Sequence, residues 1–179
     1  MRICACDPDT DTPAFALFID AALLNWCLLR SKKRHWMHLL RVLLDEWMPD
    51  LLLIENQYIP PGQGGQPSRV QSIFSLVAAR GMIQGPFLLV GIAAVLIEPL
   101  SWQKSLGGSR LGRESLKRLS VIKASDIAGI PIENHNVADA INIGYYWVKE
   151  RKEPPCTSTF TAIRSANTVG ASRRKTARS

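Results

Sequence analysis

Hydrophobic residues along the chain fall into short runs, and the length and spacing of each run indicate an element. Residues 2–7 form an apolar run that ends in an acid, and residues 51–55 form another without polar alternation, as in buried parallel strands. Two further runs, 14–19 and 23–29, lie close together and predict an antiparallel pair. Residues 95–98 predict one more strand, which makes five.

Helical periodicity appears between and after these strands. Apolar positions three and four residues apart predict helices in the following segments: 36–47, 68–85, 101–106, 114–126 and 134–149. The order of three strands, helix, strand, helix, strand and further helices predicts an α/β sandwich. We expect a mixed sheet with an antiparallel edge and helices on both faces.

The length of 179 residues predicts one domain with a substantial core. We assign residues 1–152 to this domain. No acidic residue follows Glu153, and residues 153–179 predict a flexible basic tail. The longest apolar run, 86–97, is too short to span a bilayer comfortably and is interpreted as core, so no membrane partner is expected.

Four cysteines bear on the compartment, and they are Cys4, Cys6, Cys27 and Cys156. Cys4 and Cys6 share one face of a strand and do not have the spacing of a zinc knuckle. No cleavable signal peptide is visible at the start of the chain. Free, mostly buried thiols in a reducing cytoplasm are therefore expected.

Net charge points to a polyanionic partner. Twenty-two Lys and Arg against fifteen Asp and Glu give a formal charge of +7. An excess of this sign favours nucleic acid or an anionic membrane surface, although a generic solubility charge is the alternative.

Three acids stand out within this basic chain. Asp7 and Glu55 end predicted neighbouring strands at the same end of the sheet, and Asp139 lies near the start of the last helix. Carboxylates in such places are costly to desolvate unless they are paired, and a divalent metal can pair several at once. The alternatives are strand-end acids that cap a turn, and for Asp139 a first-turn acid favoured by the helix dipole.

Three ordered motifs, Asp7-Pro8-Asp9, Ile54-Glu55-Asn56-Gln57-Tyr58 and His135-Asn136-Val137-Ala138-Asp139-Ala140, resemble the RuvC family of Holliday junction resolvases. The resemblance covers about residues 2–150 and implies an RNase H-like fold. It implies that Asp7, Glu55 and Asp139 are catalytic metal ligands.

The chain departs from the family pattern at one ligand. The family usually has an acid or His three residues before the last aspartate, and here that position is Asn136, preceded by His135. Either residue is a candidate to complete the site. Asp9 also replaces the glycine that is common in the family.

The resemblance also implies DNA-contacting residues. Tyr58 matches an aromatic that wedges into the junction, with a half-buried loop aromatic as the alternative. Lys104 matches a phosphate-contacting lysine, and Lys117, Arg110 or Arg113 match a second basic position. A solvated helix face is the alternative for these basic residues.

Phosphodiester hydrolysis needs an activated water and a stabilised leaving oxygen, which two divalent ions can supply. Oxygen ligands suit Mg²⁺, with Mn²⁺ as a substitute, and Asp7 is expected to bridge the two ions. Clustered without metal, the acids repel, so at least one pKa should be raised.

We expect a homodimeric endonuclease that cuts four-way DNA junctions symmetrically. The alternatives are another RNase H-fold nuclease acting on flaps, forks or RNA–DNA hybrids, and a catalytically decayed junction-binding module.

Overall fold

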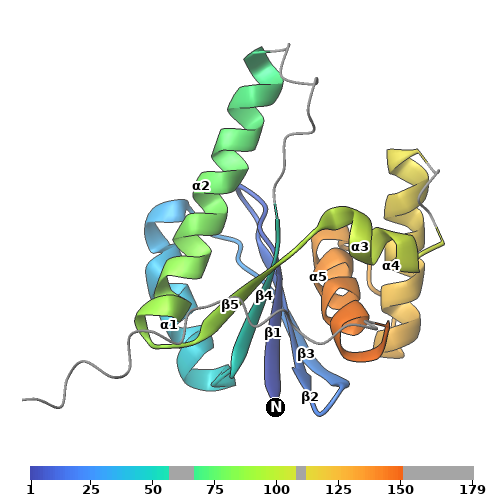
Figure 1. Cartoon of the computed structure of the whole chain (residues 1–179), viewed down its shortest axis with the longest axis horizontal. Coiled ribbons are helices and arrows are strands. Elements are labelled where there is room, and N and C mark those ends of the chain that lie inside the picture. Colours follow the sequence, from blue (N-terminus) through green and yellow to red (C-terminus); the bar gives the residue numbers. More distant parts are fainter. Residues whose placement is uncertain (57–66, 108–111, 151–179) are drawn as a thin grey trace, which may run out of the picture.

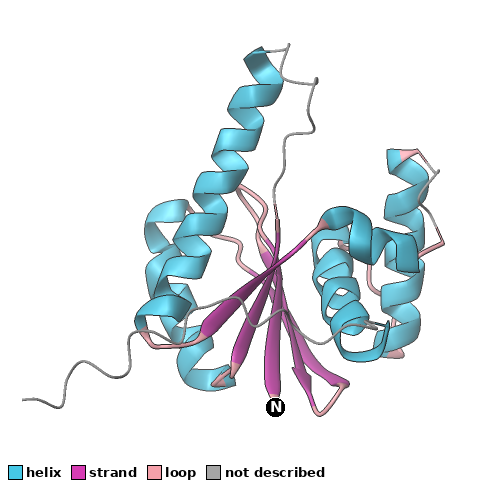
Figure 2. Cartoon of the chain, viewed as in Figure 1, coloured by secondary structure: helices cyan, strands magenta, loops and turns pink. Residues whose placement is uncertain are grey.

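A mixed sheet of five strands lies between two layers of helices (Figures 1 and 2). The computed structural model describes residues 1–56, 67–107 and 112–150. The strands are β1 (Arg2–Asp7), β2 (Ala14–Ile19), β3 (Ala22–Leu28), β4 (Leu51–Glu55) and β5 (Ala93–Ile97). The α-helices are α1 (Trp36–Trp47), α2 (Pro67–Leu89), α3 (Pro99–Ser105), α4 (Arg113–Ala128) and α5 (His135–Tyr145). Two short helical segments complete the order, η1 (Lys33–His35) before α1 and η2 (Tyr146–Glu150) after α5.

The sheet has the strand order β3-β2-β1-β4-β5. Strands β1, β2 and β3 form an antiparallel meander, whereas β4 pairs parallel to β1 and β5 parallel to β4. The predicted α/β class, the five strands and the antiparallel edge are therefore confirmed. Because β1, β4 and β5 run the same way, their carboxyl ends lie at one edge of the sheet, which we call the carboxyl edge.

Alternation along β1 and β4 directs their side chains to two separate cores. Cys4 and Cys6 on β1 pack with α1 and α2, while Ile3 and Ala5 pack with α5. Figure 1 shows α1 and α2 on one side of the sheet and α3, α4 and α5 on the other. Since Asp7 continues the register of Ile3 and Ala5, its side chain belongs to the α5 side.

Helix α5 packs closely against the sheet. The side chain of Asn134 caps its first turn and accepts a hydrogen bond from the Val137 backbone N–H at 3.1 Å. At Gly144 the helix approaches β2 so closely that an added Cβ would lie 2.2 Å from the Phe18 ring. Only glycine permits this approach, which fixes the depth at which α5 crosses the sheet.

Two sequence-based expectations need correction. The run 86–97 is not uniformly core, because Leu88, Leu89 and Val90 are exposed where α2 ends and the chain turns into the edge strand β5. The last helix is also shorter than residues 134–149, since α5 ends at Tyr145 and a π-helical turn follows.

Helix α2 contains the stretch Val70–Leu89, which is long and apolar enough to cross a membrane by length and composition alone. Its Ala79, Ile83 and Phe87 are fully buried in the core beneath the sheet. These positions recur every four residues, as expected for a helix that packs one face on a sheet.

Candidate active site

The ends of β1 and β4 bring two of the predicted acids together. Cys6 pairs with Ile54 across the parallel strands, so Asp7 and Glu55 follow in the same register. Alternation places Glu55, like Leu53, on the α5 side of the sheet. The sequence-based expectation that Asp7 and Glu55 lie side by side at one sheet end is confirmed.

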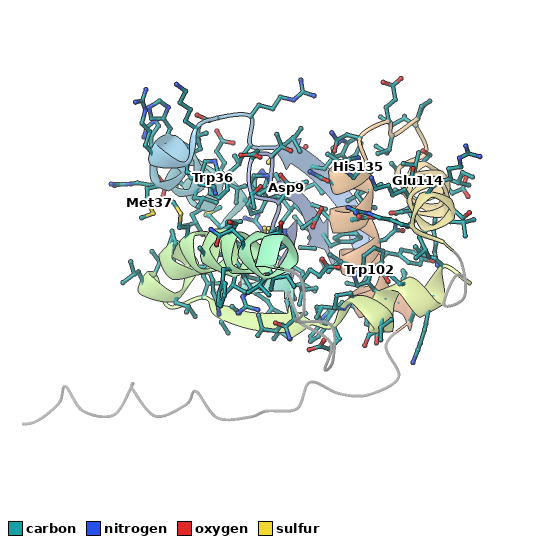
Figure 3. All side chains as sticks on the ribbon, turned by 90° about the horizontal axis from the view of Figure 1, so that it is seen from above. Asp9, Trp36, Met37, Trp102, Glu114 and His135 are labelled. Carbon is teal, nitrogen blue, oxygen red and sulfur yellow. The ribbon has the colours of Figure 1, made fainter. Side chains whose placement is uncertain are left out.

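Helix α5 contributes the third acid. It begins at His135, which places Asp139 in its second turn. The alternative that Asp139 is a first-turn acid stabilised by the helix dipole is therefore wrong, because that effect is confined to the first turn. Its neighbours on the preceding turn, His135 and Asn136, point toward the same region of the sheet edge, and Figure 3 labels His135 there.

These residues line one cleft of about 260 Å³ at the carboxyl edge. Its polar walls include the three predicted acids, together with Asp9 from the β1–β2 loop and the pair His135 and Asn136. Arg113 and Lys117, one turn apart on α4, form the basic wall. The full set of lining residues is Asp7, Asp9, Glu55, Leu76, Trp102, Gln103, Leu106, Arg113, Leu116, Lys117, His135, Asn136 and Asp139.

Buried donors hold two of the carboxylates. The indole Nε1 of Trp102, which is 2% exposed, donates to Glu55 Oε1 at 3.0 Å. The hydroxyl of Ser120 on α4 donates to Asp139 Oδ1. Asn142, one turn after Asp139, donates through Nδ2 to Ser120 Oγ at 2.9 Å. That donation occupies the Ser120 oxygen as an acceptor and leaves its proton for Asp139.

Asn136 is held by the β1–β2 loop. Its Nδ2 donates to the Thr12 backbone carbonyl at 3.0 Å and to Thr12 Oγ1 at 3.1 Å. The amide nitrogen is thus committed, which leaves the amide oxygen as the metal-ligating atom of this side chain. Asp9 orders the same loop, because its Oδ1 accepts from the backbone N–H groups of Asp11 and Thr12, both at 2.9 Å.

Burial raises the pKa of two of the acids, and repulsion from the other acids adds to the rise at Asp7. Burial, followed by the charges of Glu55, Asp139 and Asp9, raises the pKa of Asp7 well above its usual range. Burial also raises the pKa of Asp139 to about 6, while the Ser120 hydrogen bond and the neighbouring His135 and Lys117 lower it. The predicted rise of at least one pKa in the cluster is confirmed in direction. The cleft therefore favours a cation.

The predicted DNA-contacting residues are not all in the cleft. Arg113 and Lys117 line it, whereas Lys104 on α3 is exposed and is absent from its walls. Tyr58 and Arg110 lie outside the described residues. The basic tail from residue 153 also lies outside the described residues. The assignment of residues 1–152 to one domain and of 153–179 to a tail therefore stays a prediction.

Sequence reasoning missed Trp102, Ser120, Asn142 and Thr12. Each acts through a partner far away in sequence, so no local motif signals its role. One signal was available in Asp9, which departs from the family glycine and belongs to the cleft.

Residues at this site fit a divalent cation by donor chemistry. Carboxylate oxygens of Asp7, Glu55 and Asp139 and the amide oxygen of Asn136 are hard ligands of the kind that Mg²⁺ prefers. In the described part of the chain, no three His, Cys, Asp or Glu side chains are already gathered tightly enough to hold a metal ion.

No protein-family model and no curated protein matches the sequence. Among solved structures, Thermus thermophilus RuvC is similar over 82% of this chain and 95% of its own, with a TM-score of 0.59 and 15% identity. T. thermophilus RuvC in complex with Holliday junction substrate matches over 82% and 94%, with a TM-score of 0.61 and 13% identity. The yeast mitochondrial Holliday junction resolvase Ydc2 matches over 82% and 77%, with a TM-score of 0.53 and 16% identity. The predicted RNase H-like fold, shared with RuvC, is thus confirmed.

Proposed function

We propose that this protein is a metal-dependent, structure-selective DNA endonuclease that resolves four-way junctions by paired symmetric nicks. One observation carries the proposal, namely that Asp7, Glu55 and Asp139 come from three separate elements into one cleft with a basic wall. The cleft belongs to a fold shared with two junction-resolving proteins.

Each described side chain has a role in this chemistry. Asp7, Glu55 and Asp139 would hold Mg²⁺ or Mn²⁺, with Asn136 or His135 at the remaining corner. The bound ions would supply an activated water and stabilise the oxygen that leaves phosphorus. Trp102 and Ser120 fix the carboxylates of Glu55 and Asp139 in place. Arg113 and Lys117 would attract and position the phosphate backbone.

Symmetric nicking requires two clefts related by a two-fold axis, which a homodimer provides. Helix α2 supports this part of the proposal, because Phe74, Met82 and Leu89, seven or eight residues apart and so along one face, are 62%, 36% and 82% exposed. Apolar side chains of this size on a solvent-facing helix suit an interface between copies. Sedimentation of the purified protein would give the mass of the assembly.

A comparison of substrates tests the function. The protein would be given a mobile four-way junction, a flap and a linear duplex, each with Mg²⁺ and with EDTA. The proposal predicts paired, symmetric nicks on the junction in Mg²⁺ alone. Preferred cutting of the flap would favour another nuclease of this fold, and tight junction binding without cutting would favour a decayed binding module.

A further inference from the structure

A compact basic surface outside the cleft is unexplained by the proposed chemistry. Arg30, Lys32, Lys33 and Arg34 occupy four of five consecutive positions between β3 and α1, and all four are exposed. Within the described chain, none of them has a carboxylate at salt-bridge distance. We call residues 30–34 the basic corner. An uncompensated charge of this density attracts a polyanion.

The basic corner is held rigidly. Trp36, fully buried beneath it, donates through Nε1 to the Ser31 backbone carbonyl at 3.0 Å. The His35 N–H donates to the Lys32 carbonyl at 2.8 Å, which closes a turn. The Leu29 N–H donates to the carbonyl of Pro13, the residue before β2, at 2.9 Å and ties the start of the segment to the start of the neighbouring strand. The backbone that presents the charges is therefore preorganised.

Strand register places the basic corner close to the cleft. Asp7 pairs with Ala14, and Ala14 pairs with Leu28, so Asp7 and Leu28 lie in one row across the sheet. They are two strand spacings apart, about 10 Å, and Arg30 follows two residues later. Figure 3, viewed onto this edge, shows Trp36 and Met37 on one side of Asp9 and His135 on the other.

Two basic surfaces therefore flank the acids at the carboxyl edge. Arg113 and Lys117 lie on the α4 side, and the basic corner lies on the α1 side. Asp7 and Leu28 are about 10 Å apart, and the two residues from Leu28 to Arg30 add at most about 7 Å, so the basic corner begins about three to five base pairs from Asp7 along a duplex. A duplex with one phosphate in the cleft would reach the basic corner within half a helical turn.

Building on the proposed function, we infer that the basic corner is a second phosphate-binding surface. It holds a duplex arm of the branched DNA as that arm leaves the cleft across β1, β2 and β3. Its lysines and arginines contact phosphates and so position the arm without reading sequence.

Salt dependence of binding tests this inference directly. Affinity for a four-way junction and for a linear duplex would be measured in EDTA by fluorescence anisotropy across a range of salt. The variant is Lys32→Gln/Lys33→Gln, and the control is Arg41→Gln/Lys149→Gln, which removes the same charge from exposed positions outside the basic corner. Arg41 lies two turns further along α1 and faces Asp45 at 3.9 Å. Lys149 is also distant from the cleft, because it lies about 20 Å along the helical axis from His135, which lines the cleft.

We expect the slope of log affinity against log salt to be shallower by about 1.8 in the Lys32/Lys33 variant, because two phosphate contacts are lost. Near 0.1 M salt this corresponds to about 60-fold weaker binding, if affinity at about 1 M is unchanged. The control should change by much less, and the position of the nicks in Mg²⁺ should stay the same.

Equal changes in the variant and the control would overturn the inference. Unchanged DNA affinity with lost binding to vesicles of phosphatidylcholine and phosphatidylserine would overturn it too, in favour of a membrane surface. A wild type that binds junction and duplex equally would contradict the proposed function instead. In that case a shallower slope on linear duplex would still support a phosphate-binding surface at the basic corner.

Discussion

Replacing Ser120 by alanine should destabilise the protein in a manner that depends on pH. Ser120 is 1% exposed, and its hydroxyl donates a hydrogen bond to Asp139. Burial raises the pKa of Asp139 from 3.8 to about 6. That difference corresponds to about 3 kcal/mol against the charged form of Asp139 in the folded protein. Burial alone would raise the pKa of Asp139 further, because the hydrogen bond from Ser120 stabilises the charged form and offsets part of the desolvation cost.

The sign follows from the raised pKa of Asp139. Its contribution to folding is most favourable below the unfolded pKa of about 3.9 and is lost as pH rises through about 6. A hydrogen bond to an ionised group contributes about 1.5–3 kcal/mol, and one between neutral groups about 1 kcal/mol. Ser120→Ala should therefore cost about 0.5–2 kcal/mol more at pH 8 than at pH 5.

Urea unfolding in EDTA at the two pH values measures this difference. Ser125→Ala is the matched control on the same helix, because among the described residues its hydroxyl donates to the Val121 carbonyl at 2.8 Å and accepts from the Ile132 N–H at 3.0 Å, with no carboxylate partner. The control should lose the same stability at both pH values. If Ser120→Ala also loses equal stability at pH 5 and pH 8, the hydroxyl does not support an ionised Asp139 and the reasoning is refuted.

Four further substitutions test packing and site geometry. Gly144→Ala should cost about 1–3 kcal/mol by overpacking, whereas Gly81→Ala, which meets nothing within 4 Å, should stabilise α2 by about 0.5–1 kcal/mol. Thermal unfolding measures both, and equal effects would contradict the close approach of α5. Trp102→Phe removes the donor to Glu55 and should slow junction cleavage about tenfold to hundredfold without weakening binding, so an unchanged rate would count against that contact. Asn136→Asp would set a carboxylate oxygen against the Thr12 carbonyl, so Asn136→Ala is the cleaner test. It removes the amide oxygen and should weaken Mn²⁺ binding, measured by loss of the free-ion electron paramagnetic resonance signal, and unchanged binding would exclude this position as a ligand.

The strand-end acids could be predicted from sequence because each follows a short apolar run. Period-two alternation fixes their side: Asp7 shares the face of Ile3 and Ala5, and Glu55 shares that of Leu53. Asp139 could be predicted in a similar way, because it is an acid within an otherwise apolar helix. The prediction of the three acids therefore rests on the local sequence pattern together with the order of the strands.

The supporting residues could not be predicted in this way. Helix α4 buries only Ser120 and Ala124 among its residues, so its sequence has the pattern of a solvated basic helix. The role of Ser120 depends on how closely α4 packs on α5, which tertiary structure alone determines. Trp102 likewise acts on Glu55, 47 positions earlier.

The interpretation of the run 86–97 as core was wrong for a different reason. Leu88, Leu89 and Val90 are apolar but belong to a helix end and a turn at Gly91, where the backbone has a φ of +83°. An apolar run does not distinguish an interior strand from an exposed helix end beside an edge strand.

The most direct test of the central claim is junction cleavage by Asp7→Asn. Asp7 is the acid most crowded by the others, so removing its charge should abolish nicking in Mg²⁺. The same change relieves repulsion in the cluster, so junction affinity in EDTA should be retained and unfolding at neutral pH should require at least as much urea as the wild type. Normal cutting by a folded Asp7→Asn protein would contradict the assignment of this cleft as the active site.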